Sequence, residues 1–307
     1  MIQVENLTKS FGDIRAVDGI SFRVEEGQIY GLLGPNGAGK TTTLSMMIGL
    51  LAPDSGRVRF DEIDLAADPV AFRRQLGVVP QEVALYEELS ARENLRFWAG
   101  LYDLRGKELD RACTRALEQV GLEERADEPV KNFSGGMKRR LNLSIGLVHQ
   151  PRAVLLDEPT VGIDPQARLN ILEVVEAVAA GGTTVLYTTH YLEEAERLCH
   201  RIAIMDHGRI LAEGTLDELK AMVGEEETVT LTGSFSHEVV RLRVEGIRGL
   251  EVLSSEDQRM ILSTGGSSRA VMELLQAISE LEVEHIAIQP PSLNGLFLKL
   301  TGRELRD

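Results

Sequence analysis

A glycine-rich loop that ends in a lysine and two threonines is the feature of this 307-residue chain best suited to chemistry. The segment GPNGAGKTT, residues 34–42, follows an apolar run and opens a helical pattern, which is the setting that a phosphate-binding loop requires. Glycines let backbone N–H groups turn toward phosphate oxygens, and a helix N-terminus adds positive potential. The expected phosphate-binding residues are Gly34, Pro35, Asn36, Gly37, Ala38, Gly39, Lys40, Thr41 and Thr42.

Two side chains of this loop have individual expected roles. Lys40 is expected to pair with the β- and γ-phosphates of a nucleotide, and the Thr41 hydroxyl is expected to bind Mg²⁺. The competing interpretation is a glycine-rich turn that binds no ligand. The strand-to-helix context favours the nucleotide.

A second motif brings two adjacent carboxylates to the end of an apolar run. The sequence AVLLDEP, residues 153–159, predicts a strand whose carboxyl end carries Asp157 and Glu158. Because open α/β sheets bind ligands at this edge, Asp157 is expected to hold Mg²⁺, usually through water, and Glu158 to orient or deprotonate an attacking water. Without the loop at residues 34–42, solvated or helix-capping carboxylates would be the better interpretation.

The elements that must position these motifs alternate between short β-rich runs and helical patterns, which is typical of a sheet with crossover helices. The pattern predicts an α/β domain, with a mostly helical insertion at about residues 85–149. Strands are expected at residues 2–7, 20–24, 28–33, 58–60, 77–79, 154–157, 184–188 and 201–205, and helices at 39–50, 91–101, 107–120, 136–149, 165–179 and 192–199.

A change of composition at residues 224–227 predicts a linker and a second domain. Beyond it, strands are expected at residues 228–232, 239–244, 260–263 and 283–288, and helices at 268–281 and 293–300. The expected organisation is a nucleotide-binding domain over residues 1–224 and a small α+β domain over residues 225–307, in which we find no catalytic motif.

Composition and charge disfavour several classes of protein. With 43% hydrophobic and 26% charged residues the chain is expected to be globular, and its formal net charge of −15 disfavours nucleic-acid binding and attachment to anionic lipid. The longest run without charged residues, 177–192, has 16 positions, whereas a bilayer-spanning helix needs about 20 apolar residues. We expect no membrane span and no secretory signal, and we expect Cys113 and Cys199 to be reduced structural thiols.

The segment NFSGGMKRRL, residues 132–141, resembles the signature motif of ATP-binding cassette (ABC) ATPases and lies, as in that family, just upstream of the strand with the two carboxylates. The resemblance implies a P-loop NTPase fold with a RecA-like core and a helical subdomain. It also implies that Ser134, Gly135 and Gly136 contact the γ-phosphate of ATP held by a second copy of the chain. In isolation, the segment could equally be a serine N-cap followed by two flexible glycines.

Other cassette elements follow in the family's order, so the resemblance covers essentially all of residues 1–222. It implies that Phe11 stacks on adenine with Val17 nearby, and that Gln81, in VVPQE, contacts Mg²⁺ or the attacking water and reports to a transmembrane partner. It further implies that Asp164, in VGIDP, lies in a loop that crosses the dimer interface, and that His190, in YTTHY, contacts the γ-phosphate. Taken singly, the aromatic could be a half-buried surface residue and the histidine a structural one.

The signature and the chain's ending point to one branch of the family. The common LSGGQ has Phe133 and Met137 at its outer positions here, which removes the glutamine side chain but keeps three γ-phosphate contacts. SGGM followed by KRRL, together with residues 290–307, resembles daunorubicin-resistance exporters. Asn294 and Gly295 stand where that branch often has an acidic pair. The end domain is expected to regulate, to stabilise a dimer, or only to pack.

Two further clusters have competing interpretations. Lys138, Arg139 and Arg140 could bind phosphate or cover a helix surface, and a solvated helix face is the expected role. Phe97 and Trp98 lie in the helical region where the resemblance places a groove for a permease. We expect both to belong to the helix core, because paired aromatics on an amphipathic helix usually face inward.

The resemblance therefore implies an ATP-hydrolysing motor subunit that binds ATP and Mg²⁺ and drives export of a drug or another hydrophobic or amphipathic compound. The expected partners are a second copy of the chain and a separate membrane permease, with no nucleic acid. The expected location is the cytoplasmic face of the cell membrane, reached through the permease.

Three alternatives share parts of this pattern: the motor of an importer, a soluble ABC ATPase of translation or DNA repair, and a degenerate structural cassette. Only the branch-like signature and ending speak against the importer. A single cassette without sustained heptads disfavours the soluble ATPase. Intact Lys40, Asp157, Glu158 and His190 disfavour the degenerate cassette.

Replacing Ser134 with arginine is expected to block ATP-driven dimerisation, because a long cationic side chain would fill the space that the γ-phosphate needs. Size-exclusion chromatography of the purified variant with and without ATP measures the effect. Normal ATP-induced dimerisation of Ser134→Arg would refute a nucleotide sandwiched between two copies.

Overall fold

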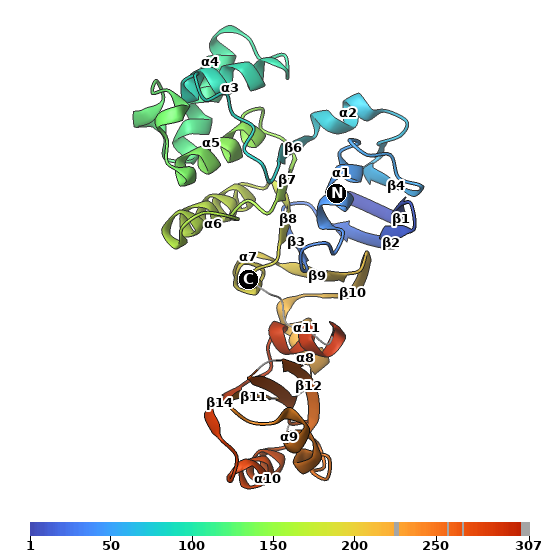
Figure 1. Cartoon of the computed structure of the whole chain (residues 1–307). Coiled ribbons are helices and arrows are strands. Elements are labelled where there is room, and N and C mark those ends of the chain that lie inside the picture. The colour runs from blue at the N-terminus through green and yellow to red at the C-terminus, as the bar shows by residue number, and fades with distance from the viewer. Residues whose placement is uncertain (224–226, 257, 266, 302–307) are drawn as a thin grey trace. The chain divides into compact units, whose positions relative to one another are not determined.

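The computed structural model describes residues 1–223, 227–256, 258–265 and 267–301. The chain divides into two compact units, Met1–Ile210 and Leu211–Asp307, which are described separately (Figure 1). The boundary expected between residues 224 and 225 falls one helix later than this division, after α8 (Leu216–Val223). The predicted linker lies, apart from Glu227, outside the described residues, and the domain boundary stays a prediction.

The first unit, whose residues are all described, contains a mixed sheet and an antiparallel sheet. The mixed sheet has the order β10-β9-β3-β8-β7-β6, in which β9, β3, β8, β7 and β6 are parallel. The antiparallel sheet has the order β2-β1-β4-β5. The strands are β1 (Ile2–Phe11), β2 (Ile14–Val24), β3 (Ile29–Leu33), β4 (Ser55–Phe60), β5 (Ile63–Asp64), β6 (Leu76–Val79), β7 (Ala153–Asp157), β8 (Thr184–Thr189), β9 (Arg201–Asp206) and β10 (Arg209–Gly214).

The central strands β3, β7 and β8 are buried along their whole length. Their sequences IYGLL, AVLLD and TVLYTT are apolar runs rather than alternating patterns, as expected for parallel strands covered on both faces. Parallel pairing aligns Leu33 with Thr189, and Asp157 with Thr188. The carboxyl ends of the three strands therefore meet at one edge, as the sequence predicted for the site.

Helices cover the sheets and form a separate cluster. Between β6 and β7 the chain forms α3 (Ala91–Gly100), α4 (Gly106–Gln119) and α5 (Gly135–Leu147), which lie together away from the antiparallel sheet (Figure 1). They share a core that includes Leu95, Ala116 and Leu141. This is the predicted helical insertion. The other helices of the unit are α1 (Lys40–Met47), α2 (Pro69–Arg74), α6 (Pro165–Ala180) and α7 (Leu192–Leu198).

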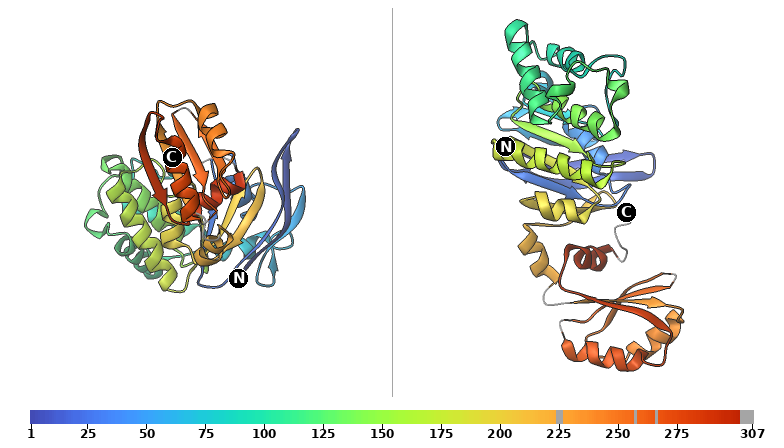
Figure 2. Two further views of the ribbon diagram at one scale, coloured as in Figure 1. Left: turned by 90° about the horizontal axis from the view of Figure 1, so that it is seen from below. Right: turned by 90° about the vertical axis from the view of Figure 1, so that its left-hand side faces the viewer.

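The second unit is an α+β fold, as predicted. Its antiparallel sheet has the order β12-β13-β11-β14, with α9 and α10 on one face and α11 on the other (Figure 2, right). Its described elements are α8, β11 (Thr228–Gly233), α9 (His237–Val244), β12 (Glu251–Glu256), β13 (Arg259–Ser263), α10 (Ser268–Ile278), β14 (Val283–Gln289) and α11 (Leu293–Thr301).

One predicted element has the wrong type. Residues 239–244 were expected to form a strand, yet they belong to α9. Val240 and Val244, four residues apart, are both buried against the sheet, whereas Leu242 is 65% exposed. Helical spacing therefore decides which side chains reach the core, and it overrides the β-propensity of valine. Each other predicted strand or helix overlaps an observed element of the same kind.

Among the described residues, no helix has both the length and the apolar character needed to cross a bilayer. Cys113 and Cys199 are free, buried thiols.

A close approach between two glycines seats α5 on the mixed sheet. A Cβ at Gly77, in β6, would overlap the carbonyl oxygen of Gly146, and a Cβ at Gly146, in α5, would lie 2.6 Å from Val79 Cγ2. Glycine at both positions lets helix and strand backbones touch. The helix that carries the SGG motif is thereby fixed against β6.

Gly77→Ala is expected to lower stability by about 1–3 kcal/mol, because the added methyl group overpacks this backbone contact. Gly100→Ala is the matched control, since the nearest atom to its Cβ is Arg105 Nη1 at 3.7 Å. Thermal unfolding of both variants measures the difference. An equal melting temperature for the two would show that the Gly77 contact is not tight.

Candidate functional site

The glycine-rich loop lies between β3 and α1, at the carboxyl edge of the parallel strands. A Cβ at Gly34 would overlap the Met205 carbonyl oxygen, and one at Gly39 would overlap the Ala16 carbonyl oxygen. Gly39 has φ of 106° and begins α1 with no side-chain cap for the first-turn N–H groups. A tight loop of small residues and an uncapped helix start fit phosphate oxygens.

Lys40, Glu158 and His190 form one buried cluster, although 118 and 32 positions separate them along the chain. Lys40 Nζ lies 2.9 Å from Glu158 Oε1 and donates to the carbonyl oxygens of Gly34, at 2.6 Å, and Pro35, at 3.1 Å. His190 Nδ1 lies 3.1 Å from Glu158 Oε2. The side chains are only 4–7% exposed. Both oxygens of Glu158, the carboxylate predicted to orient or deprotonate the attacking water, therefore have a partner that holds them in place.

The backbone around Glu158 is held in an unusual conformation. Its φ is 44°, a left-handed value that a side chain disfavours. Its N–H donates to Thr188 Oγ1 at 2.9 Å, and that hydroxyl donates to Asp157 Oδ1 at 2.8 Å. Hydrogen bonds between β7 and β8 thus maintain local strain beside the two carboxylates. Strain of this kind is typical of functional sites.

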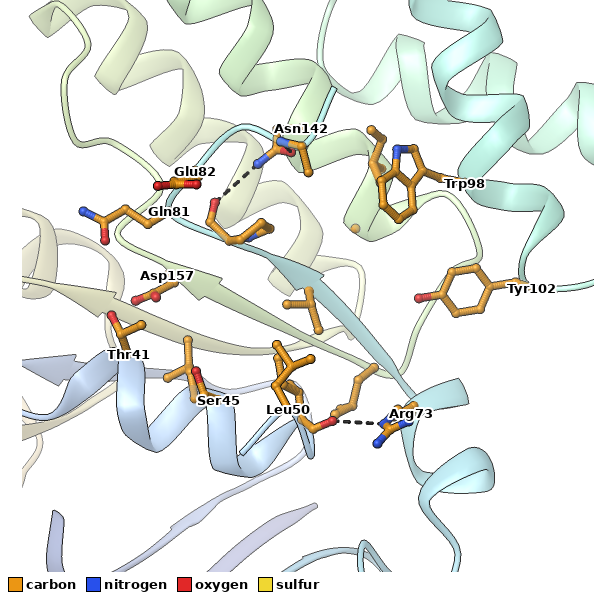
Figure 3. A pocket seen from close by; sticks show the side chains of 18 residues that line it. Thr41, Ser45, Leu50, Arg73, Gln81, Glu82, Trp98, Tyr102, Asn142 and Asp157 are labelled. Atoms are coloured by element: carbon orange, nitrogen blue, oxygen red, sulfur yellow. Dashed lines mark hydrogen bonds between the residues drawn. The ribbon is translucent and has the colours of Figure 1, made fainter. Parts of the chain in front are cut away.

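The residues predicted to bind Mg²⁺ face a common cavity of about 780 Å³. Thr41, Gln81 and Asp157 lie near one another at one end of it, coming from α1, the segment after β6, and β7 (Figure 3). A hydroxyl, an amide oxygen and a carboxylate are hard oxygen donors, and Mg²⁺ usually takes one or two protein ligands together with phosphates and water. The donor set fits a Mg²⁺–nucleotide.

Phe11 lies near the tip of the β1–β2 hairpin, where it pairs with Ile14. Its side chain is 51% exposed, and Lys9 Nζ lies 5.9 Å from the ring centroid. An exposed ring face is available for stacking on a base. Val17 is fully buried in the core, so its side chain packs inward.

The structure does not bring the SGG motif or Asp164 into the Lys40–Glu158–His190 cluster. Ser134 caps α5, and Asp164 caps α6 by accepting from Ala167 N at 3.0 Å. A Cβ at Gly136 would lie 2.6 Å from Ala167 Cβ, so the two helix starts are packed together. Among the described hydrogen bonds and ion pairs, none joins either cap to the three clustered side chains.

Lys138 forms a surface ion pair with Glu87, but Arg139 and Arg140 do not lie on a solvated helix face, contrary to expectation. Arg139 is 5% exposed and donates from Nη1 to the Gln81 carbonyl oxygen and from Nη2 to the Val161 carbonyl oxygen at 3.2 Å. Burial lowers the pKa of this guanidinium. Arg140 donates to the carbonyl of Val120 at 2.7 Å. The two arginines bind backbone carbonyls of segments that are distant in the sequence. No local sequence pattern indicates these partners.

The expected core position is wrong for Phe97. Its ring is 44% exposed and packs edge-on against Tyr86, at 4.9 Å between centroids, and Trp98, at 5.5 Å. Trp98 is half-buried, lines the cavity and has a buried Nε1 without a hydrogen-bond partner. Of the two aromatic residues, Trp98 therefore borders the cavity (Figure 3).

Sequence reasoning missed how α5 holds the segment after β6. Asn142 is buried, accepts from Ala84 N at 3.1 Å and donates to the Pro80 carbonyl at 3.4 Å. Arg139, Asn142 and Gly146 lie on one helix face by their spacing of three and four residues. The sequence shows this spacing. It does not show that the face contacts the segment after β6.

Comparisons with known proteins point to one family. A family model described as "ABC transporter" matches residues 17–161. The linearmycin resistance ATP-binding protein of Bacillus subtilis (strain 168) is 41% identical, with all of both chains aligned. A daunorubicin resistance ATP-binding protein of Streptomyces coeruleorubidus is 38% identical over 99% of this chain and 97% of its own. A solved dimeric cassette with ADP and Pi is 27% identical, with a TM-score of 0.63 over 70% of this chain and 99% of that one.

Glu158→Gln is expected to lower ATP turnover by about a hundredfold or more while ATP binding persists, because the amide keeps the shape but cannot accept a proton from water. Steady-state turnover and equilibrium nucleotide binding measure the two effects. The uncleaved ATP should also trap a dimer that is visible by size-exclusion chromatography. Undiminished turnover would remove Glu158 as the base.

Arg139→Gln is expected to lower ATP turnover by about tenfold, because it frees the segments that carry Gln81 and Asp164, and small misplacements are costly in catalysis. Arg140→Gln is the matched control, since its carbonyl partners, Val120 and Gly121, lie within the helical insertion. Turnover is compared at equal folded fraction, established by thermal unfolding. Equal losses in the two variants would contradict a specific role for Arg139.

Proposed function

The chain belongs to the ABC transporter family as an ATP-binding subunit that hydrolyses ATP, and from this premise we propose that it drives export through a separate membrane permease. The observation that carries the proposed chemistry is the buried Lys40–Glu158–His190 cluster beside the glycine-rich loop. The support for export is similarity along the whole chain, second unit included, to ATP-binding proteins of linearmycin and daunorubicin resistance.

In the proposed reaction, residues 34–42 bind the phosphates of ATP, with Lys40 on the β- and γ-phosphates and Phe11 stacked on the adenine. Glu158 orients the attacking water and accepts its proton, and His190 contacts the γ-phosphate. The Lys40–Glu158 pair must open or share its partners when phosphate enters, since both would then face the same group. Pairing before binding lowers the cost of burying either charge.

Mg²⁺ fits the oxygen donors of Thr41, Asp157 and Gln81, and when bound it would neutralise charge on the phosphates. The chain's own part is to place these donors at one end of the cavity. Arg139 and Asn142 hold the backbone on both sides of Gln81, which fixes where its amide can reach.

Two copies of the chain complete the proposed site. Ser134–Gly136 and Asp164 lie outside the Lys40–Glu158–His190 cluster of their own chain, so they are free to serve the partner's γ-phosphate and interface. ATP would then stabilise a closed dimer through contacts that hydrolysis removes. The dimeric cassette with ADP and Pi, to which this chain is similar, supports such an assembly.

The cavity beside Gln81 is the proposed contact with the permease. It is lined mainly by apolar side chains of α1, β6, α3 and α5, with Trp98 and Tyr102 on one wall (Figure 3). An apolar groove with a few polar groups suits a short helical segment of a partner. Because Gln81 lies at its end, a seated partner would act directly on the proposed Mg²⁺ site.

The permease would place the chain at the cytoplasmic face of the cell membrane, with no part for nucleic acid. We propose residues 1–224 as the nucleotide-binding domain and residues 225–307 as an accessory domain that regulates or stabilises the dimer. The proposed cargo is a drug or another hydrophobic or amphipathic compound, in line with the resistance functions named for the relatives.

The proposal is tested by purifying the tagged chain with its membrane partner in mild detergent and reconstituting the complex in liposomes. We expect a co-purifying protein with several apolar spans of about 20 residues each and no cassette of its own. ATP added on the cassette side should move daunorubicin away from that side. The Glu158→Gln complex is the control and should move none.

Transport toward the cassette side would make the chain an importer motor. Recovery of ribosomal or DNA-bound partners in place of a membrane protein would contradict the transport function while leaving ATP hydrolysis intact. Transport of daunorubicin that persists in the Glu158→Gln complex would separate movement of the compound from this ATPase.

A further inference from the structure

A further buried carboxylate, beyond Asp157 and Glu158, has no role in the chemistry described so far. Glu194, in α7, is 2% exposed, and three hydroxyl groups donate to it. Thr160 donates to Oε1 at 2.6 Å, while Tyr187 and Thr189 donate to Oε2 at 2.9 and 2.7 Å. A buried carboxylate is tolerated when its lone pairs are filled in this way, and such charge-assisted bonds are strong.

The hydroxyl donors come from the two segments that carry the proposed base and the histidine. Thr160 lies two residues after Glu158, and Thr189 lies immediately before His190. Thr189 Oγ1 also accepts from Tyr191 N at 2.9 Å, which closes the turn around the histidine. One carboxylate therefore ties together the chain segments that follow β7 and β8.

A cation on α6 balances this carboxylate. Arg168 Nε lies 3.7 Å from Glu194 Oε1, and its guanidinium stacks 4.2 Å from the Tyr191 ring centroid. The Tyr191 ring in turn lies 4.2 Å from that of His190. Arg168 also belongs to the first turn of the helix that Asp164 caps. The surroundings of Glu194 thus reach both the histidine and the proposed interface loop.

The third donor keeps its proton throughout the physiological range. Burial, reinforced by the negative charge of Glu194, holds the pKa of Tyr187 well above its usual value. The phenol can therefore only donate to the carboxylate.

We propose that Glu194 is a positioning residue, which sets the distance between the Glu158 carboxylate and the His190 ring by holding Thr160 and Thr189 on a single acceptor. The inference rests on the proposed roles of Glu158 and His190 in hydrolysis. The binding loop meets this network through the backbone, where Gly34 N donates to the Thr189 carbonyl oxygen at 3.2 Å. Among the described side-chain bonds of the network, none reaches residues 34–42, so a change at the Glu194 side chain should leave nucleotide binding in place.

The test is steady-state ATP hydrolysis by the full-length chain without permease. Glu194→Gln keeps the size of the side chain, but its amide group cannot accept hydrogen bonds on both ends. We expect kcat to fall by about tenfold or more, because a misplacement of about 1 Å is costly, with KM for ATP changed by less than about twofold. This split distinguishes positioning from a general loss of folded protein.

If Glu194→Gln does not fold, Thr160→Val and Thr189→Val test the same hydrogen bonds to Glu194. Each removes a single hydroxyl, and each is expected to lower kcat by about threefold to tenfold at constant KM. The double variant Glu194→Gln/Thr160→Val should lose no more kcat than Glu194→Gln alone, because both changes break the same hydrogen bond, from Thr160 to Glu194. If the fold-losses of kcat in the two single variants multiply in the double variant, the two residues act separately.

Glu93→Gln is the matched control. Glu93 accepts two hydrogen bonds from Ser90 in the helical insertion, so its loss should lower the melting temperature and leave kcat unchanged. The proposal is overturned if folded Glu194→Gln keeps its kcat, if its KM rises in place of a fall in kcat, or if the control loses as much turnover. Full turnover of Glu158→Gln and His190→Ala would instead refute the site itself, which is a separate outcome.

Discussion

The pairing of a buried lysine with a buried glutamate is the interaction on which the site depends. Removing an ammonium and a carboxylate from water costs several kcal/mol for each ion unless they meet at close range with further hydrogen bonds. Lys40 and Glu158 satisfy this condition only because β3, β8 and β7 are neighbours in a parallel sheet, which brings the loop after β3 to the end of β7. His190 joins them from the strand between. The sheet order is thus a structural requirement of the chemistry.

Helix α5 connects the parts of the site that must act together. Ser134 stands at its start, Arg139 and Asn142 hold the backbone around Gln81, and Gly146 seats the helix on β6. One helix therefore carries the motif proposed to act on a second copy, forms one wall of the cavity, and supports the segment that contains Gln81. Binding of a partner in the cavity would be coupled to the nucleotide site through these side chains and their hydrogen bonds.

Each chain holds two chemically incomplete halves. The Lys40–Glu158–His190 cluster has a buried carboxylate and a cation but lacks the SGG helix start, and that helix start lies beside the Asp164 cap. In the proposed dimer, separation of the halves would make hydrolysis conditional on assembly. The tied loops around Glu158 and His190 would then keep the shape of the cluster while its complement arrives from another molecule.

The sequence alone determined the α/β class, the helical insertion and the strand-end positions of the loop, the carboxylates and His190, because these depend on local patterns of apolar residues, glycines and charges. Only the tertiary structure decided the features that depend on contacts between residues far apart in the sequence. Arg139 is buried because carbonyls from two loops converge on it, and residues 239–244 are helical because Val240 and Val244 share one packed face. Phe97 stays exposed and packs edge-on against Tyr86 and Trp98 in place of the helix core. The Glu194 network belongs to the same class: its three hydroxyl donors are ordinary residues until β7 and β8 bring them to one acceptor.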